Sequence, residues 1–349
     1  MPKLPRLTWL LPALLLTGCD RLVVLDPSGD IARQQGHLIV IATVLMLLVI
    51  VPVIALTLYF AWRYRASNRA ARYTPDWDHS TQLELVIWGG PLLIILALGA
   101  ITWITTHTLD PYRPLDRIAP GKPVPAGVKP LEVQVVSLDW KWLFIYPEQG
   151  VATVNELALP VDRPVRFKLT SSNVMNAFYV PELAGMIYTM PGMQTELNAV
   201  ANAPGRFRGK SSNYSGAGFS WMQFDVLALD EPGFERWVAQ TRAAGGELSR
   251  SAYLALEQPS RQVPVQRYGR VDPGLYDAVL NRCVDPRRMC MHHMMAIDAA
   301  GGRSAARAGL ASLQPRTRGD LRGRPYVPDD ATCTTEPAPA VFDLARRAP

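Results

Sequence analysis

One segment of the sequence has the spacing of a metal-binding loop. It runs from Lys210 to Phe224 and reads KSSNYSGAGFSWMQF, with serines, glycines, aromatic residues and a methionine at distinctive intervals. Copper is held in proteins by thiolate and imidazole ligands, and hydroxyl or amide groups do not replace them. The segment contains no cysteine and no histidine. It therefore has the outline of a copper-binding loop without the groups that would bind the metal.

The same ligands are missing from a much longer stretch of the chain. No cysteine lies between Asp20 and Arg282, and no histidine lies between Thr108 and Met291. Met222, inside the segment, offers a thioether, which is a weak ligand by itself and more often fills gaps in a core. No fold of this region can assemble a thiolate-bridged copper site from residues that are absent.

A second group of metal-ligand side chains lies near the C-terminus. Cys283, Cys290, His292 and His293 occur with four methionines in the stretch CVDPRRMCMHHMMA. Sulfur and imidazole ligands suit copper, but the spacing matches no metal site that we can name. In an oxidising compartment Cys283, Cys290 and Cys333 would instead form one disulfide and leave one free thiol. The sequence leaves metal binding and disulfide formation both open.

The composition argues against a nucleic-acid-binding protein. The 349 residues carry 36 Lys and Arg against 30 Asp and Glu, which gives a net charge of +6. The basic residues gather in no patch of the kind that binds DNA or RNA. The 30 prolines indicate turns and β-structure rather than long soluble helices.

The N-terminus has the features of an export signal. Lys3 and Arg6 precede the apolar run LTWLLPALLL, which is too short for a membrane span. The sequence Leu-Thr-Gly-Cys at positions 16–19 resembles the bacterial lipobox, in which the cysteine thiol is acylated and becomes the new N-terminus. We therefore expect lipidation at Cys19, and Asp20 resembles the residue that holds such lipoproteins at the inner membrane. The alternative is an ordinary signal peptide with a cysteine at this place by chance.

Two further segments are apolar enough to cross a bilayer. The first, residues 38–62, has no charge and would reach about 37 Å as a helix, which crosses ~30 Å of hydrocarbon with tilt. Pro52 should kink this helix rather than break it. The second, residues 83–106, carries Trp88 and Trp103 near its ends as interfacial anchors.

The loops set the orientation of these two spans. The connector, residues 63–82, carries four arginines close to the first span, whereas the segment before that span has two arginines against three aspartates. The positive-inside rule places the connector in the cytoplasm and both flanks outside. Export of Cys19 requires the same topology, so the chain beyond residue 107 is expected in the periplasm.

The exported part of the chain has the pattern of β-structure. Short segments rich in aromatic and β-branched residues, such as 131–147 and 220–229, are separated by proline and glycine. Short antiparallel strands over about 100 residues predict a sandwich or Greek-key barrel. After Pro232 amphipathic patterns predict short helices, and the composition from about Ala299 onward predicts disorder.

The predicted fold is a membrane-anchored all-β protein with a two-helix transmembrane hairpin, a Greek-key β-sandwich or barrel, and short C-terminal helices. The predicted ranges are a lipoprotein signal peptide at 1–18, a periplasmic N-terminal segment at 19–37, transmembrane helices at 38–62 and 83–106, a cytoplasmic loop at 63–82, a linker at 107–130, the β-domain at 131–232, a helical or extended segment at 233–293 and a disordered tail at 294–349.

Two spans, an exported β-domain and this loop together resemble subunit II of the haem–copper terminal oxidases, whose outer domain is a cupredoxin. In copper-bearing members the loop reads C-x-E-x-C-G-x-x-H-x-x-M, and an earlier strand supplies one more histidine. Glu84, Trp88 and Pro91 match the membrane motif of the family, and the resemblance covers roughly residues 16–282. The copper-site positions here hold Asn176, Ser211, Asn213, Ser215, Phe219 and Met222, of which only the methionine is retained.

Two stretches, DWKWLFIYPEQGVATVNE and SSNVMNAFYVPE, are similar to the ubiquinol oxidase branch, the cytochrome bo type. This resemblance implies a complex that oxidises quinol, reduces oxygen and pumps protons. It also implies that the haems, the oxygen-reducing copper and the quinol site belong to subunit I, so that this chain holds no cofactor and no catalytic residue. The implied partners are subunit I, the smaller subunits and membrane lipid, and the degenerate loop would be kept for packing.

Glu84 is the one residue that we expect to take part in the chemistry. It lies at the cytoplasmic edge of the second span, where a carboxylate is costly unless it is hydrated or paired. In the family the matching glutamate lies at the mouth of the K-type proton channel, so the resemblance implies a role in proton uptake. The alternative is an interfacial glutamate that only contacts water.

Three further functional interpretations are electron transfer through two tryptophans and two other functions of the whole chain. Trp140 and Trp142 match an aromatic motif that passes electrons inward in copper-bearing relatives, but without copper a packing role is expected. A copper-bearing cytochrome c oxidase subunit II is disfavoured by the missing ligands. A free-standing cupredoxin-like membrane lipoprotein, which would bind a periplasmic partner, is disfavoured by the two spans with the Glu84 motif.

Overall fold

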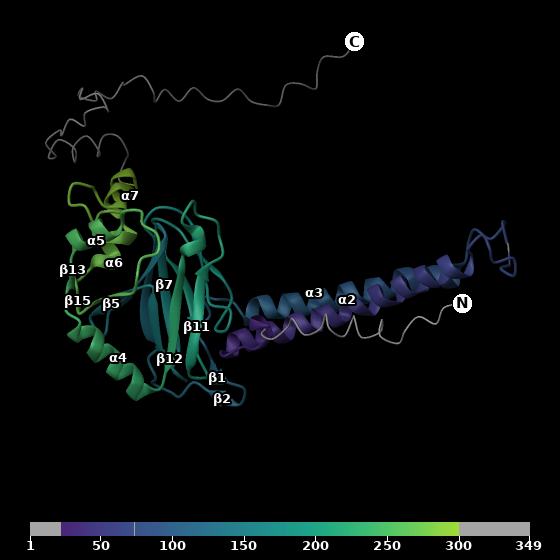
Figure 1. Cartoon of the computed structure of the whole chain (residues 1–349), viewed down its shortest axis with the longest axis horizontal. Coiled ribbons are helices and arrows are strands. Elements are labelled where there is room, and N and C mark those ends of the chain that lie inside the picture. The colour runs from purple at the N-terminus through teal and green to yellow at the C-terminus, as the bar shows by residue number, and fades with distance from the viewer. Residues whose placement is uncertain (1–21, 73, 300–349) are drawn as a thin grey trace, which may run out of the picture. The chain divides into compact units, whose positions relative to one another are not determined.

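The computed structural model describes residues 22–72 and 74–299, and it begins with two long helices followed by a β-rich region and short helices (Figure 1). The helices are η3 (Val23–Leu25), α2 (Asp30–Arg63), α3 (Thr81–Thr108), η4 (Phe219–Trp221), α4 (Glu231–Ala243), α5 (Arg250–Leu256), α6 (Leu275–Leu280) and α7 (Met291–Ala299). The strands are β1 (Arg117–Ala119), β2 (Lys122–Pro123), β3 (Leu131–Leu138), β4 (Lys141–Tyr146), β5 (Val151–Val154), β6 (Glu156–Pro160), β7 (Val165–Ser171), β8 (Asn176–Tyr179), β9 (Ile187–Thr189), β10 (Thr195–Ala199), β11 (Gly205–Ser211), β12 (Gln223–Leu229), β13 (Glu247–Leu248), β14 (Gln266–Tyr268) and β15 (Arg270–Val271).

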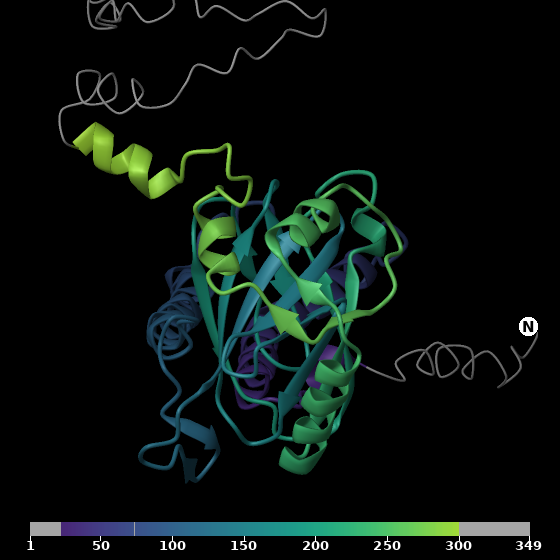
Figure 2. The ribbon, with the colours of Figure 1, turned by 90° about the vertical axis from the view of Figure 1, so that its left-hand side faces the viewer.

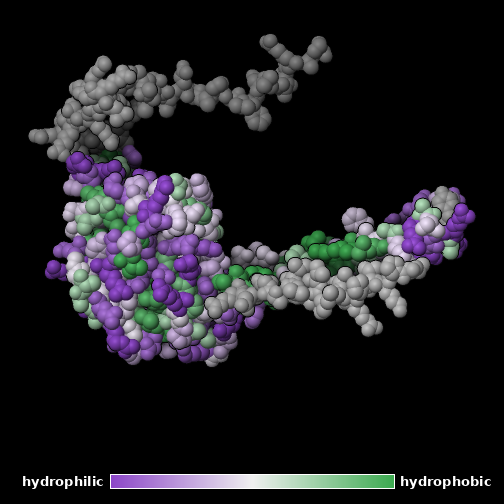
Figure 3. Space-filling view, in the orientation of Figure 1, coloured by the Kyte–Doolittle hydropathy of each residue, from purple (hydrophilic) through white to green (hydrophobic). Residues whose placement is uncertain are grey.

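The helices α2 and α3 are each long and apolar enough to cross a membrane, and none of the residues in their most apolar windows is buried inside the chain. Their apolar side chains cover the outside of the hairpin, and the loop that joins them is hydrophilic (Figure 3). In water such an exposed apolar surface would be unfavourable, whereas a bilayer solvates it. The helix α2 continues through Pro52, as expected for a membrane-spanning helix.

The first helix begins earlier than the apolar run that predicted it. It starts at Asp30 rather than at residue 38, and the second helix covers Thr81–Thr108 rather than 83–106. Asp30 lies in the first turn of α2, where a carboxylate interacts favourably with the helix dipole, and it accepts a hydrogen bond from Gln34 Nε2 at 2.8 Å. Polar helix-favouring contacts therefore extend the helix beyond the span that hydropathy alone identifies.

The start of α2 is bound to the β-domain. Asp30 is buried, with 2% of its surface exposed, and Arg117 Nε donates to its Oδ2 at 2.9 Å. The Gly29 N–H donates to the Glu182 carbonyl at 2.9 Å, and a Cβ at Gly29 would lie 2.6 Å from the Leu183 carbonyl oxygen. A side chain at residue 29 would thus separate the hairpin from the domain.

The β-domain is a sandwich of two sheets, which confirms the predicted cupredoxin-like fold. One sheet has the strand order β10-β7-β3-β4-β5-β14 and the other has the order β6-β12-β11-β8-β9. Aromatic side chains fill the space between them: Phe178 stacks on Phe224 with ring centroids 5.4 Å apart, and Trp142 meets Phe178 edge-on at 5.5 Å. Because these rings are almost fully buried, they are expected to supply much of the stability of the domain.

The sequence predicted antiparallel strands, but some strand pairs in the structure are parallel. The strands β3 and β7 are parallel, and so are β6 and β12. The chain passes from β5 in one sheet to β6 in the other at Asn155, which has φ of 58°. Its side chain accepts from the Trp142 N–H at 2.9 Å and donates to the Val263 carbonyl at 2.8 Å.

The C-terminal segment forms part of the β-domain rather than following it. The strand β14 pairs with β5 as the sixth strand of the larger sheet, and α5 and α6 pack on the outer face of that sheet through Tyr253, Leu275 and Val279 (Figure 2). Residues of β4 are therefore buried on both faces, which explains why the sequence KWLFIY does not alternate. The expected boundary at residue 232 divides a structure that packs as one.

Two other predicted ranges differ from the structure or extend beyond its described part. The predicted linker at 107–130 contains a two-stranded hairpin of β1 and β2. The first residues of the predicted tail, 294–299, belong to α7, and residues 300–349 lie outside the described part of the chain. The chain divides at residue 292 into two compact units, of which the first holds the hairpin and the β-domain.

Candidate functional site

The loop that resembles a copper site is held between β11, which ends at Ser211, and β12, which begins at Gln223. The neighbouring strand β8 begins at Asn176 and runs antiparallel to β11, with Ser211 opposite Phe178. The Ser211 N–H donates to the Met222 carbonyl at 3.1 Å and so closes the loop at its base. These strands therefore bring together side chains that are far apart in the sequence.

Asn176 and Ser211 meet in the interior of the domain. Asn176 is 1% exposed and Ser211 is 4% exposed. The Ser211 Oγ lies 3.2 Å from Asn176 Oδ1 and 3.2 Å from the Asn213 carbonyl oxygen, and the Ala177 N–H donates to it at 3.4 Å. Buried polar groups are costly unless they are hydrogen-bonded, and here an amide and a hydroxyl satisfy each other.

The other loop residues complete this arrangement. Ser215 Oγ donates a long contact to Met222 Sδ at 3.9 Å, and Met222 is 1% exposed. Asn213 Nδ2 donates to the Met175 carbonyl at 3.1 Å. The ring of Phe219 meets Tyr214 edge-on with centroids 5.7 Å apart. The structure thus gathers Asn176, Ser211, Ser215 and Met222 around the base of the loop, with Phe219 in a contact of its own.

The donor set of this loop does not fit copper. It consists of amide and hydroxyl oxygens, amide nitrogens and one thioether, without thiolate or imidazole. Across residues 22–72 and 74–299 no group of three or more His, Cys, Asp or Glu side chains is placed to hold a metal ion. The polar groups of the loop instead form hydrogen bonds with one another and with the neighbouring backbone.

Trp140 covers the loop and fixes its glycines. Its Nε1 donates to the Ser215 carbonyl at 2.9 Å, and the Arg261 guanidinium lies 5.5 Å from its ring centroid. A Cβ added at Gly218 would overlap the carbons of the Trp140 ring, and Gly216 has φ of 110°, where L-residues are strained. The glycines of the loop are therefore required by the tryptophan packed on them.

Replacing Gly218 by alanine is expected to lower the free energy of unfolding of the β-domain by about 1–3 kcal/mol, because the Trp140 ring has to move. Thermal and urea unfolding of the purified full-length chain measure this change. Gly99→Ala is the matched control, since a Cβ there meets nothing within 4 Å. Equal unfolding curves for the two variants would contradict the role of Gly218.

A buried lysine near the loop was not singled out by the sequence. Lys141 is 1% exposed, and its Nζ donates to the Gln258 carbonyl at 2.9 Å and to Ser260 Oγ at 2.6 Å. Burial lowers the pKa of Lys141, and Asp139 opposes this shift. The lysine fastens the segment that carries Arg261 over Trp140. The only signal in the sequence is a lysine between two tryptophans in DWKW.

Glu84 lies in the first turn of α3 and has a partner that sequence reasoning missed. Its Oε1 lies 2.9 Å from His79 Nδ1, and both side chains are more than half exposed. His79 Nε2 lies 3.1 Å from Thr81 Oγ1. Glu84, Trp88 and Pro91 all belong to α3. The geometry places two groups that can exchange protons with water at the start of the helix.

The cysteines near the C-terminus are paired in the structure. Cys283 and Cys290 form a disulfide that closes a loop between them. His292 and His293 belong to the second compact unit, where their rings meet at a centroid distance of 4.1 Å. Cys19, Cys333 and their surroundings lie outside the described residues.

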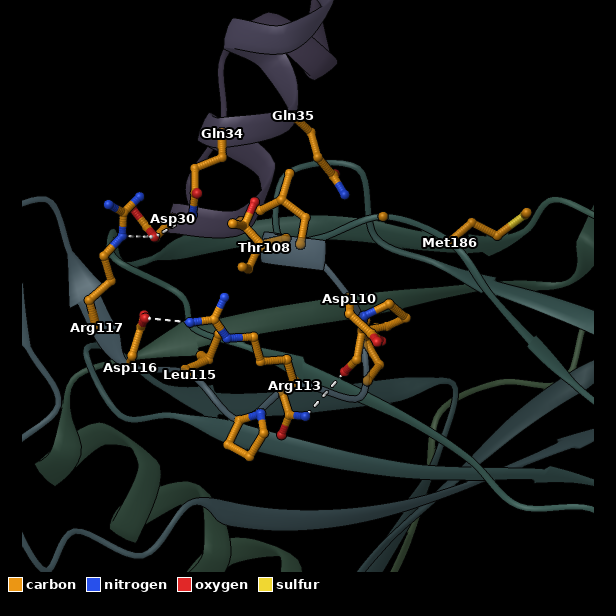
Figure 4. Close-up of a pocket in the computed structure, with 17 residues that line it drawn as sticks. Asp30, Gln34, Gln35, Thr108, Asp110, Arg113, Leu115, Asp116, Arg117 and Met186 are labelled. Carbon is orange, nitrogen blue, oxygen red and sulfur yellow. Dashed lines mark hydrogen bonds and ion pairs between the residues drawn. The ribbon is translucent and has the colours of Figure 1, made fainter. Parts of the chain in front are cut away.

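A hollow of about 260 Å³ lies where the hairpin meets the β-domain, between the start of α2, the end of α3 and the segment after it (Figure 4). Arg117 is paired there with Asp30, and Arg113 Nη2 with Asp116 Oδ2 at 3.0 Å. The cations that line the hollow are thus paired with carboxylates of the same wall. The Arg117–Asp30 pair connects the hairpin to the β-domain, and we assign no chemical reaction to the hollow.

Comparison with known proteins gives two family matches. Residues 133–229 match the family described as "Cytochrome C oxidase subunit II, periplasmic domain". Residues 242–287, which contain α5, β14 and α6, match the family described as "COX Aromatic Rich Motif".

Individual relatives extend the similarity over most of the chain. This chain is 48% identical over 317 residues to "Cytochrome bo(3) ubiquinol oxidase subunit 2" of Pseudomonas aeruginosa, with 90% of this chain and 91% of the relative covered. It is 48% identical over 280 residues to "Ubiquinol oxidase subunit 2" of Acetobacter aceti, with 80% and 88% covered. Among solved structures, the periplasmic domain of subunit II of cytochrome oxidase of Bradyrhizobium japonicum is 24% identical, with a TM-score of 0.31, over 32% of this chain and 91% of that chain.

Proposed function

The chain belongs to the ubiquinol oxidase subunit 2 family of the haem–copper oxidases, and from this premise we propose that it is the copper-free second subunit of a proton-pumping quinol oxidase. Its own role is to hold and complete subunit I. The observation that carries this proposal is the loop at Ser211–Met222, whose copper positions hold groups that hydrogen-bond to one another and include no thiolate or imidazole.

The electrons of the reaction bypass this chain. Quinol bound in the membrane delivers electrons to haem in subunit I, where the haems and the oxygen-reducing copper lie, and this chain holds no cofactor. The exposed apolar faces of α2 and α3 support this arrangement, because they offer subunit I and lipid a surface without charges over most of its length. The β-domain then lies on the periplasmic side of the inner membrane, above the complex.

Glu84 takes part in proton uptake from the cytoplasm. Its carboxylate is exposed at the start of α3 and contacts His79 at 2.9 Å, so it meets water while standing beside an apolar helix. A titratable group in such a place can collect protons for a path that begins in subunit I. No other described residue of α3 before His107 carries an acid or a base.

Copurification tests membership of the complex. A tagged, detergent-solubilised chain should bring down a haem-bearing subunit, the smaller subunits and quinol oxidase activity. Recovery of the intact chain without haem, under conditions that preserve oxidase activity in the membrane extract, would favour a free-standing lipoprotein instead.

Lipidation at Cys19 is a further part of the proposal, supported by the lipobox-like sequence at positions 16–19. Cys19→Ser is expected to abolish lipid attachment, which mass spectrometry of the mature N-terminus measures. The variant should stay in the membrane, because two spanning helices anchor far more strongly than acyl chains do.

The matched control for this experiment is Asp20→Asn, which leaves the thiol in place and should still be acylated. Release of the Cys19→Ser chain into the soluble fraction would contradict the two-span topology. An unmodified Cys19 in the mature wild-type chain would contradict lipidation alone.

A further inference from the structure

An open groove of about 580 Å³ lies beside the hollow described above, and Gln35 and Met186 line both (Figure 4). One wall is the segment before α2, a second is the start of α2, and the third consists of the loops that follow β8 and β11. Val24, Leu38 and Ile39 contribute apolar surface, and no charged side chain of the described part of the chain lines the groove. Such a surface favours an apolar occupant, because a charged group would lose its hydration there without gaining a partner.

The segment before α2 folds back along the helix. A Cβ at Gly36 would lie 3.1 Å from the Val24 carbonyl oxygen, so the segment lies against the helix at this glycine. Gly36 is about 9 Å along α2 from Asp30, and Leu38, the first residue of the predicted membrane span, follows it closely. The chain therefore lies at the level of the membrane surface at Val24, before it turns to enter α2.

Cys19 is close to this groove along the chain. It lies shortly before Leu22, the first described residue, and the three residues of chain between their Cα atoms reach about 11 Å at most. Leu22, Val23, Val24 and Leu25 are exposed, although all four are apolar. Water is an unfavourable neighbour for such a run, and an acyl chain is a favourable one. The lipid proposed at Cys19 would thus start beside the wall of the groove.

We propose that an acyl chain attached to Cys19 lies in this groove and packs against Val24, Ile39 and Met186. This inference rests on the lipidation of Cys19 proposed above. In this position the acyl chain contacts the segment before α2, the helix and the β-domain at once. It thereby supports the joint between the hairpin and the β-domain by burying their apolar surface, which is a structural role beyond membrane anchoring.

Two features favour the attached acyl chain over a free phospholipid. The acyl chain on Cys19 brings no phosphate, and no lysine or arginine of the described residues lines the groove to pair with one. The groove also extends from Ile39 in the apolar span to Tyr179 and Met186 at the β-domain, so a free lipid would have to leave the bilayer in part to fill it. A tethered chain is instead kept beside the groove at high effective concentration.

Photo-cross-linking of the oxidase complex, purified through a tag on this chain, tests the proposal. Cells that make the complex are grown with a fatty acid that carries a photoreactive diazirine group, and the purified complex is irradiated and digested. Mass spectrometry of one sample then reports both the lipid on the peptide with Cys19 and the peptides that are cross-linked to lipid. We expect cross-links at residues 24–39 and 179–186, and we expect their loss in Cys19→Ser.

The outcomes separate this proposal from lipidation itself. An unmodified Cys19 in the wild-type complex would contradict lipidation and this proposal together. A lipid-modified Cys19 without cross-links at residues 179–186, or with cross-links only to another subunit, would overturn the groove proposal alone. Equal cross-linking at these residues in the wild type and in Cys19→Ser would also overturn it and assign the groove to a free phospholipid.

A charge placed in the groove provides a second test. Met186→Asp puts a carboxylate against the acyl chain and should lower the cross-link yield at residues 179–181 by about tenfold relative to the wild type. Met193→Asp is the matched control, since Met193 does not line the groove. The two methionines are 43% and 54% exposed, so both variants are expected to fold. An unchanged yield in Met186→Asp, or an equal decrease in the two variants, would contradict the proposal.

Discussion

Replacing Glu84 by glutamine or alanine is expected to slow quinol oxidase turnover by about tenfold in the assembled complex, which corresponds to about 1.4 kcal/mol on the rate-limiting barrier. The carboxylate of Glu84 is exposed at the start of α3 and lies 2.9 Å from His79. It is therefore placed to accept a proton from bulk water and pass it on toward the membrane. Removing this carboxylate is expected to slow proton delivery and to leave the chemistry at haem intact. Steady-state oxygen consumption with a soluble quinol measures the effect.

Conservative changes separate proton uptake from structure. Glu84→Asp should retain more activity than Glu84→Gln, because the shorter acid still titrates. His79→Asn should have a smaller effect than either, since His79 acts through Glu84 in this geometry. Haem content and the quinol KM are expected to stay near wild type in every variant. Wild-type turnover in a fully assembled Glu84→Gln complex would leave this chain a purely architectural role.

The membrane hairpin and the sandwich could be predicted because each has a strong local signal. A long run of apolar residues is solvated favourably only in a bilayer. Short aromatic strands separated by prolines are compatible with only a few folds, such as a sandwich. The ends of the helices were less predictable. Asp30 extends α2 through contacts with Gln34 and Arg117, and Arg117 is 87 residues away in the sequence. Hydropathy describes only the segment itself, so it does not detect a contact of this kind.

The extent of the β-domain was also beyond local reasoning. Residues Gln266–Tyr268 form a short strand with no periodic pattern of their own, and they are ordered because β5 presents an unpaired edge to them. The five apolar residues in a row after Lys141, WLFIY, were the one sign that something covers the second face of the sheet. That sign does not identify which later segment provides the cover.

The loop positions could be found in advance, but the groups that fasten them could not. Asn176, Ser211, Ser215 and Met222, which were identified through the resemblance to a copper-bearing loop, meet because the strand register of β8 and β11 determines their distances. Lys141 and its contacts depend on a segment more than a hundred residues later. A lysine within a strand is usually taken for a solvent-facing residue, and only the folded chain reveals that it is buried.

Contacts within the protein close the loop at several places. The Trp140 ring excludes a side chain at Gly218, the Ser215 carbonyl accepts from Trp140 Nε1, and Ser211 is satisfied by Asn176. A scaffold that is already closed by protein contacts is a favourable starting point for restoring metal ligands, because little further ordering is needed.

Restoring the ligands is expected to convert a chain without stoichiometric copper into one that binds it tightly and shows a visible copper–thiolate absorption band. The loop has the length of the copper-bearing pattern, and β8 already holds residue 176 beside Ser211 Oγ at 3.2 Å. Thiolate and imidazole groups at these places have the chemistry that amides and hydroxyls lack. The variant combines Asn176→His, Ser211→Cys, Asn213→Glu, Ser215→Cys and Phe219→His.

Metal analysis and absorption spectra of the full-length chain in detergent, after incubation with copper and removal of the excess, provide the measurement. The wild-type chain should retain no stoichiometric copper and show no such band, and finding tightly bound copper there would contradict the copper-free reading of the loop. A matched variant that keeps Ser215 but carries the other four changes has one thiolate, two imidazoles and the Met222 thioether, which is the donor set of a mononuclear blue-copper site, so it should bind one copper ion per chain where the full variant binds two. If the full variant folds but binds no copper, then the contacts of Trp140 with Gly218 and Ser215 hold the loop in a shape that a metal site cannot use.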